Sequence, residues 1–338
     1  MKSNATRRQL IRCIAASAVV FATLGASGTT HAQGKSKLRL VLPTPATTYQ
    51  LPFLIAKDTG WFAQRGLEVE EIFVNGDATA LRMVLAGSGD ITVVGPPTVF
   101  QALNEGAKIK YIGSPQPLVD YQILGAKSIT TLAGLGDKTF ASAGPSDMTT
   151  EIPRLLLRKS NINTDKVRFL QVGGHAARLQ ALEAGKVQGA MVNTLTTVIA
   201  QRNGQVNVIA NVAKEFPQLG YVMYTVQAAA LEDPAKFKAL EIFIQGNIIG
   251  ARTIMKDPDA AAQILSKRVP DLSLDLLVPV LKQLNASNVW GVDGGLDPAM
   301  VAFTSDALSS WKMIDKPVTA KEIIDDRVVK AALSSLPK

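Results

Sequence analysis

The chain repeats part of its own pattern, and this repeat limits the possible folds more than any other feature of the sequence. Shifting the sequence by 98 positions places residues 74–98 on residues 172–196 without a gap. Eight positions are identical, for example Gly76 and Gly174. Either a true duplication or shared local structure explains these identities among small and apolar residues. Both explanations predict two lobes with the same order of strand, loop, helix, strand and loop, and a cleft between them.

The clearest local pattern lies near the start of the first lobe. An apolar strand over 38–42 leads into a threonine-rich loop, and a helix that begins near Pro52 ends before Gly60. Proline fits the first helical turn, where its missing N–H has no partner, and glycine fits the left-handed residue that ends a helix. A strand over 67–73 follows, and the alternation of strands and helices continues through both lobes. It predicts mostly parallel sheets flanked by helices, with ligand sites at the carboxyl ends of strands.

Two segments of this unit resemble a known family. Residues 52–62 read PFLIAKDTGWF, and residues 66–70 read GLEVE. They resemble the periplasmic substrate-binding proteins of the nitrate, sulfonate and taurine class of ABC importers, which share their fold with the thiamine-pyrimidine synthases of yeast. The resemblance implies a two-lobed α/β periplasmic binding protein of type II with a two-strand hinge. We expect lobe 1 to comprise 36–123 and 224–338, and lobe 2 to comprise 124–223.

The first 32 residues are typical of a signal peptide. A basic start is followed by an apolar run from Ile14 to Leu24, and small residues then lead to Ala32, where cleavage is expected. The run is too short to span a bilayer comfortably, although an uncleaved membrane anchor is the alternative. Adjacent Arg7 and Arg8 also resemble a twin-arginine signal, so both the Sec and the twin-arginine routes stay open. We expect the mature protein to be periplasmic.

Charge and residue usage argue against several classes of function. The formal net charge is +8, but loss of residues 1–32 removes four basic residues and no acidic one, so the mature chain is only mildly basic. Such a charge does not favour nucleic acid as a partner. Loss of Cys13 and His31 leaves no cysteine and only one histidine, His175. We therefore expect no metal site, no cofactor and no nucleophilic catalysis, because a nucleophile needs an activating base beside it.

Candidate ligand contacts lie in the loops that follow the strands of the two lobes. The first loop offers hydroxyls beside a helix N-terminus, which suits an oxyanion, although helix capping explains the same residues. Asp77 and His175 occupy the same position of the repeat, and Asn193 follows a strand of the second lobe. Tyr121 and Tyr221 lie near the expected crossings between the lobes, where they either stack on a flat ligand or pack in the hinge. The predicted ligand-binding residues are Thr47, Thr48, Tyr49, Asp77, Pro97, Thr98, Ser146, Thr149, His175 and Asn193.

The sequence predicts binding without turnover. We expect a monomeric solute-binding protein that captures a small organic anion, of the sulfonate or carboxylate class, and delivers it to the permease of an ABC importer with its ATPase. No arginine lies in the predicted loops, and Arg178, one turn after His175, is the nearest candidate to clamp an anion. A neutral pyrimidine-like heterocycle is therefore the alternative ligand. An enzyme that acts on such a heterocycle and a sensor that docks on a receptor are the alternative functions.

Overall fold

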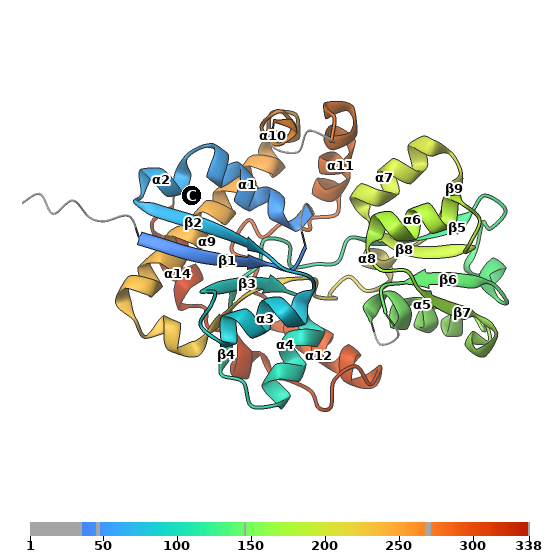
Figure 1. Cartoon of the computed structure of the whole chain (residues 1–338), viewed down its shortest axis with the longest axis horizontal. Coiled ribbons are helices and arrows are strands. Elements are labelled where there is room, and N and C mark those ends of the chain that lie inside the picture. The colour runs from blue at the N-terminus through green and yellow to red at the C-terminus, as the bar shows by residue number, and fades with distance from the viewer. Residues whose placement is uncertain (1–35, 45–47, 145–146, 268–271, 337–338) are drawn as a thin grey trace, which may run out of the picture. The chain divides into compact units, whose positions relative to one another are not determined.

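The computed structural model describes residues 36–44, 48–144, 147–267 and 272–336. The chain divides into Met1–Gly34, which lies outside the described residues, and a second unit, Lys35–Lys338. The predicted signal peptide, residues 1–32, therefore lies outside the described part. Within the second unit, two five-stranded sheets form the centres of two lobes (Figure 1).

The first sheet has the strand order β2-β1-β3-β10-β4, and β10 is antiparallel to both of its neighbours. Its strands are β1 (Ser36–Leu42), β2 (Leu67–Phe73), β3 (Ile91–Val94), β4 (Ile109–Gly113) and β10 (Met223–Gln227). Side chains of β1 alternate between two cores. Leu38 and Leu40 belong to one core and Val41 to the other, as expected for a strand that is buried on both faces.

Helices cover both faces of the first sheet (Figure 1). Among the helices of this lobe, those that contribute to the core of Leu38 are α1 (Leu51–Asp58), α2 (Trp61–Gln64), α9 (Pro234–Lys256), α10 (Pro258–Ser266), α11 (Leu274–Ala286) and α14 (Arg327–Ser334). The helices that share the core of Val41 are α3 (Asp77–Leu85), α4 (Pro96–Asn104), α12 (Pro298–Ser310) and α13 (Ala320–Ile323). Within the described residues, no helix combines the length and the apolar character that a membrane crossing requires.

The second sheet repeats the plan of the first. Its order is β7-β6-β8-β5-β9, and β5 is antiparallel to both neighbours. Its strands are β5 (Tyr121–Ala126), β6 (Thr139–Ser142), β7 (Arg168–Gln171), β8 (Gly189–Asn193) and β9 (Val206–Asn211). Its helices are α5 (Met148–Lys159), α6 (His175–Glu183), α7 (Thr194–Asn203) and α8 (Val212–Glu215), and the 3₁₀ helices of the two lobes are η1 (Thr48–Gln50), η2 (Leu132–Leu135), η3 (Thr164–Lys166) and η4 (Ala228–Leu231). The predicted fold class is confirmed, with one antiparallel strand in each mostly parallel sheet.

The chain passes between the lobes twice, over residues 114–120 and 216–222. These two crossing segments run antiparallel and contact each other, and the Tyr221 N–H donates a hydrogen bond to the Pro117 carbonyl at 2.8 Å. Strand β5 pairs within the second sheet along its whole length, so the first crossing ends slightly earlier than the sequence predicts. The strand that follows each crossing, β5 or β10, is the antiparallel strand of the sheet it enters.

Helices α1 and α9 approach closely because Gly250 has no side chain. A Cβ atom on Gly250 would lie 2.0 Å from the carbonyl oxygen of Pro52 in the first turn of α1. Because this oxygen belongs to the backbone, it cannot move away as the end of a flexible side chain can. The contact between Gly250 and Pro52 therefore holds α1, the helix that follows the first predicted ligand loop, close against α9.

We expect Gly250→Ala to lower the free energy of unfolding by about 2 kcal/mol, because the clash outweighs the gain in helix propensity of about 1 kcal/mol. Urea denaturation measures this change. A Gly-to-Ala control without a clash is Gly174→Ala, since no heavy atom lies within 4 Å of a Cβ there and φ is −64°. Because Gly174 is the N-cap of α6, where alanine is disfavoured, this control should cost about 1 kcal/mol or less. Equal or higher stability of Gly250→Ala would contradict the close contact.

Candidate ligand-binding cleft

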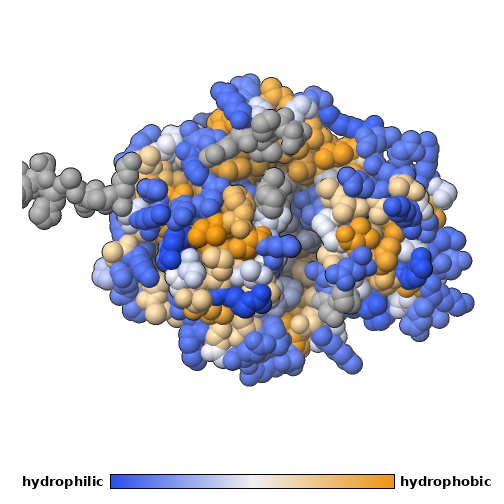
Figure 2. Space-filling view, viewed as in Figure 1, coloured by the Kyte–Doolittle hydropathy of each residue, from blue (hydrophilic) through white to orange (hydrophobic). Residues whose placement is uncertain are grey.

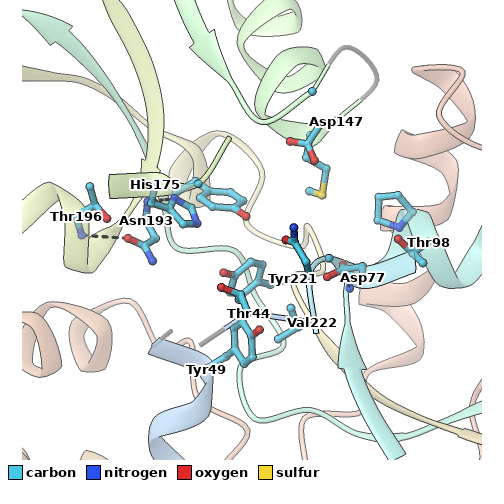
Figure 3. A pocket seen from close by; sticks show the side chains of 18 of the residues that line it. Thr44, Tyr49, Asp77, Thr98, Asp147, His175, Asn193, Thr196, Tyr221 and Val222 are labelled. Carbon is cyan, nitrogen blue, oxygen red and sulfur yellow. Dashed lines mark hydrogen bonds between the residues drawn. The ribbon is translucent and has the colours of Figure 1, made fainter. Parts of the chain in front are cut away.

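A cavity of about 1120 Å³ lies between the two lobes. Figure 2 shows the surface hollowed along this boundary, and Figure 3 shows side chains of both lobes around the cavity. Helices α3, α4, α5, α6 and α7 all begin at its walls. A concave site of this size accommodates a small organic ligand, and sites of this kind occur preferentially between domains.

The repeat places an equivalent hydrogen bond on each side of the cleft. In lobe 1, Asp77 opens α3, and its Oδ2 accepts a hydrogen bond from the Gly95 N–H at 2.8 Å. In lobe 2, His175 opens α6, and its Nδ1 accepts a hydrogen bond from the Asn193 N–H at 3.2 Å. Each bond spans 18 residues and joins the start of a helix to the end of the next strand. The same backbone arrangement thus presents a carboxyl group in one lobe and an imidazole in the other.

Two carboxylates line the cleft from opposite lobes (Figure 3). Desolvation raises the pKa of Asp77 to about 6, and the negative charge of Asp147 adds to this rise, whereas the hydrogen bond from Gly95 opposes it. Asp147 caps α5, and its Oδ1 accepts a hydrogen bond from the Thr149 N–H at 2.8 Å. The negative charge of Asp147 therefore acts on Asp77 across the cleft.

His175 is held as a neutral ring with a defined tautomer. Desolvation, followed by the positive charge of Arg178, lowers its pKa from the ordinary 6.5 to about 3. Its Nδ1 receives the Asn193 N–H and lies 3.0 Å from Nη2 of Arg178, and both of these groups are donors. Nδ1 must therefore accept, which places the ring proton on Nε2. The cleft wall gains a neutral N–H donor rather than a charge.

Arg178 lies behind His175 and does not line the cavity. Its side chain is 2% exposed, and burial lowers its pKa. The guanidinium donates to the Met191 carbonyl at 2.8 Å and to the Gly173 carbonyl, in addition to His175. These three partners are neutral. The arginine that the sequence offers as an anion clamp therefore orients the imidazole instead.

We expect His175, the only histidine after residue 32, to titrate with a midpoint near 3 in the folded protein and to carry its proton on Nε2 above that pH. Because the folded pKa is depressed below the unfolded one, this group stabilises the fold above about pH 6.5, and that contribution is lost as the pH falls toward 3. Imidazole ¹⁵N NMR of the chain without residues 1–32 measures both properties. The urea-unfolded chain is the control and should titrate near 6.5. A folded-state midpoint near 6.5 would contradict the buried neutral ring.

Four aromatic rings form a continuous row along the cleft. Tyr49 and Tyr221 meet edge to face with ring centroids 5.9 Å apart, and Tyr221 meets Tyr121 in the same way at 5.4 Å. Tyr121 in turn lies against His175, with centroids 5.7 Å apart. This aromatic row, Tyr49, Tyr221, Tyr121 and His175, runs from lobe 1 through the second crossing segment to lobe 2, and all four residues line the cavity. The tyrosine rings stand at 75° and 76° to one another, so the row offers ring edges and faces at the cleft wall and not a single flat surface.

Six of the ten predicted contacts line the cavity, although they come from segments far apart in the sequence. They are Tyr49, Asp77, Pro97, Thr98, His175 and Asn193. Thr48 and Thr149 are absent from the lining and are only 1% and 3% exposed. Thr149 Oγ1 accepts a hydrogen bond from the Ala143 N–H at 2.7 Å, so its role is structural. Thr47 and Ser146 lie outside the described residues.

The structure adds lining residues that the sequence analysis missed or left undecided. Asp147 was missed, although an acidic residue in a loop between a strand and a helix is a signal that sequence alone provides. Tyr121 and Tyr221 line the cavity, so they do more than pack in the hinge. Tyr224, the third tyrosine near the crossings, is instead buried in lobe 1, where its hydroxyl donates to Asn247 Oδ1 at 2.6 Å.

Asp120 is a buried carboxyl group at the end of the first crossing segment. It is 2% exposed, and its Oδ2 accepts a hydrogen bond from the Thr194 N–H at 3.2 Å. Its Oδ1 has no hydrogen-bond partner among the described residues. Burial raises its pKa to about 6. The folded state therefore holds this proton more tightly than the unfolded state, and the associated stability is lost as the pH rises from about 4 through 6.

We expect Asp120→Asn to raise the free energy of unfolding at pH 8 by on the order of 1–3 kcal/mol, because it removes a buried charge. At pH 4 the carboxyl group is largely protonated in the fold, so the variant should differ little from the parent. Denaturant unfolding at both pH values tests this, with exposed Asp165→Asn as the control. If Asp120→Asn changed the free energy of unfolding by the same amount at pH 4 and at pH 8, the buried charge of Asp120 would not be the cause of that change.

Comparison with known proteins assigns the chain to a family. A family model described as NMT1/THI5 like matches residues 47–261, which is more than half of the chain. The chain belongs to the NMT1/THI5-like family. This match confirms the family resemblance inferred from residues 52–70. No curated protein matches this NMT1/THI5-like chain.

Solved structures share the fold of this NMT1/THI5-like protein. The periplasmic aliphatic sulphonate binding protein SsuA from Escherichia coli is 17% identical with a TM-score of 0.66, over 86% of this chain and 92% of its own. The periplasmic nitrate-binding protein NrtA from Synechocystis PCC 6803 is 13% identical with a TM-score of 0.68, over 89% of each chain. A ligand-binding component of an ABC-type import system from Staphylococcus aureus, with zinc bound, is 14% identical with a TM-score of 0.72, over 88% of this chain and 99% of its own. At these identities the matches establish the fold of a periplasmic binding protein.

Proposed function

We propose that this NMT1/THI5-like protein is the extracytoplasmic solute-binding component of an ABC importer. The observation that carries the proposal is the large cleft, which both lobes line and which lies beside the two paired crossing segments. Membership of the family and the shared fold of sulphonate-binding, nitrate-binding and other import components support it. The signal peptide predicted over residues 1–32 supports export to the periplasm.

Closure of the two lobes on the ligand supplies the mechanism. Two segments, 114–120 and 216–222, carry the backbone between the lobes, and helices α7 and α11 also touch across the boundary, where Arg202 donates to Asp275. Rotation about the two segments would move one lobe against the other. A ligand that contacts both Asp77 in lobe 1 and His175 in lobe 2 binds the closed form better than the open form, and so shifts the population toward closure. The closed form then docks on the permease, where the ATPase of the importer drives release and uptake.

Two other functions use the same cleft. An enzyme would need a base for a nucleophile, but Nδ1 of His175 already accepts the Asn193 N–H. In the described part of the chain, no three His, Cys, Asp or Glu side chains are grouped to hold a metal ion. Binding without turnover therefore fits the site better than catalysis does. A sensor that docks on a receptor uses the same closure, so a growth and uptake assay on a deletion strain separates it from transport.

The proposed transport role is tested by screening ligands and then measuring closure. A ligand at about 100 times its dissociation constant should stabilise the protein by about 2.7 kcal/mol, which a melting shift detects. Cysteines introduced at Arg82 and Gln180, exposed and equivalent positions of α3 and α6, provide spin labels in a chain with no other cysteine after residue 32. We expect the ligand to shorten and narrow the distance distribution between these labels.

The controls separate binding from the other functions. Doubly labelled protein without ligand defines the open distribution, and mass spectrometry of the released compound shows whether it is unchanged. A ligand that binds without any change in the distance between labels would overturn the closure mechanism. A compound that is consumed would support the enzyme.

A further inference from the structure

The charged side chains at the cleft wall are both acidic. Among the described lining residues, Asp77 and Asp147 carry carboxylates, and no lysine or arginine is present. The adjoining segments 45–47 and 145–146 contain no charged residue in the sequence. Arg178 places its positive charge behind His175 and directs its donors to that ring and to two carbonyls. The groups that a ligand meets directly are therefore negative or neutral.

Two of the five helix N-termini at the cleft, those of α5 and α7, are capped by side chains of the protein itself. At α5, Asp147 accepts the Thr149 N–H, and at α7, Asn193 Oδ1 accepts the Thr196 N–H at 3.0 Å. The first α7 N–H, that of Thr194, donates to Asp120. Helices α3, α4 and α6 have no side-chain cap, but the carboxylate of Asp77 stands at the start of α3, and Pro96 and Pro97, which have no N–H, remove the first donors of α4.

The aromatic row supplies contacts for a ligand that carries a ring. The aromatic row extends across both lobes, and aromatic faces attract cations as well as rings. At one end of the row, the neutral imidazole of His175 adds an N–H donor. The carboxylates of Asp77 and Asp147 line the same cavity and can accept N–H groups of such a ligand (Figure 3).

On the basis of the function proposed above, we propose that the ligand is a flat, positively charged nitrogen compound, an aromatic amidine or amine, which bridges Asp77 and Asp147. Charge also explains how such a ligand closes the lobes. The two carboxylates belong to opposite lobes, so their repulsion opposes closure of the empty cleft. A cation between them replaces this repulsion with two attractions, whereas an anion of the same shape would add to the repulsion. The sulfonate or carboxylate predicted from the sequence is therefore disfavoured by the side chains that line the cleft.

Benzamidine and benzoate form a matched pair of probes, because they share a flat ring and a planar head group but carry opposite charges. We expect calorimetric titration of the ligand-stripped protein at pH 7.5 to give a dissociation constant for benzamidine at least about tenfold lower than that for benzoate. Benzamide, the neutral analogue, should fall between them. Benzamidine should also shorten the distance between labels at positions 82 and 180, whereas benzoate should not.

Two substitutions test the bridging carboxylates. Asp77→Asn and Asp147→Asn keep an oxygen that accepts the structural N–H but remove the negative charge, so each should weaken benzamidine binding about tenfold or more. Neither should weaken benzamide binding to the same extent. Asp297→Asn is the matched control, because Asp297 caps α12 by accepting an N–H two residues on at 2.8 Å, as Asp147 does in α5, but lies on the exposed surface.

The pH dependence of benzamidine binding is a second test of the role of Asp77. Protonation of Asp77, whose pKa is about 6, should weaken benzamidine binding as the pH falls from 7.5 to 5. His175 stays neutral over this range, and Asp120, which also titrates near 6, lies outside the lining. The Asp77→Asn variant, which lacks this carboxyl group, should lose most of the pH dependence of benzamidine binding.

Three results would overturn the inference. They are tighter binding of benzoate or benzenesulfonate than of benzamidine, no measurable binding of benzamidine at millimolar concentration, and Asp77→Asn and Asp147→Asn variants that bind benzamidine as the parent does. With any of these results, the proposed role in solute binding would still hold if an anion from the ligand screen closed the lobes. A screen in which no compound closes them would overturn the proposed function as well.

Discussion

The contact between the two crossing segments is the constraint on which the rest of this structure depends. The Tyr221 N–H donates to the Pro117 carbonyl, so the two connections between the lobes lie side by side. Each connection then enters a sheet between two other strands as the strand antiparallel to both neighbours, β5 or β10. This places Tyr121 and Tyr221 at the boundary between the lobes, where their rings meet. The hinge and the wall of the ligand cleft are therefore built from the same few residues.

The repeat gives the two lobes the same backbone and different chemistry. Asp77 and His175 make equivalent hydrogen bonds to the ends of the next strands, which holds both side chains at the cleft. Burial then acts in opposite directions on their pKa values, because it disfavours the charged form of each: it raises the pKa of Asp77 and lowers that of His175. One lobe thus offers a carboxyl group that titrates near 6, and the other offers a neutral donor that Arg178 keeps in one tautomer.

The order of residues in the sequence predicts many of the residues that line the cleft, but it does not predict the charges that a ligand meets there. Strand-to-helix loops meet at one edge of a sheet, and for this reason the sequence alone places Tyr49, Thr98 and Asn193 at the cleft, whose wall they form. Thr149 shows the limit of this reasoning, since a loop hydroxyl can turn inward and bond its own backbone. Asp147, two residues earlier, lines the cleft instead. Only the direction of each side chain separates these roles, and that direction is set by packing.

The sequence by itself determined the two lobes, the order of their elements and the positions where helices open onto the cleft, because these depend on periodicity, glycine and proline signals and an internal repeat. The tertiary structure decided which charges a ligand meets. Arg178, one turn along α6, points into the protein toward carbonyls, whereas Asp147 stays at the surface of the cleft. A charged side chain on a helix can point toward a ligand or toward the core. Its position along the sequence does not show which of the two directions it takes. Desolvation and the neighbouring lobe, which exist only in the fold, determine both the direction and the ionisation of such groups.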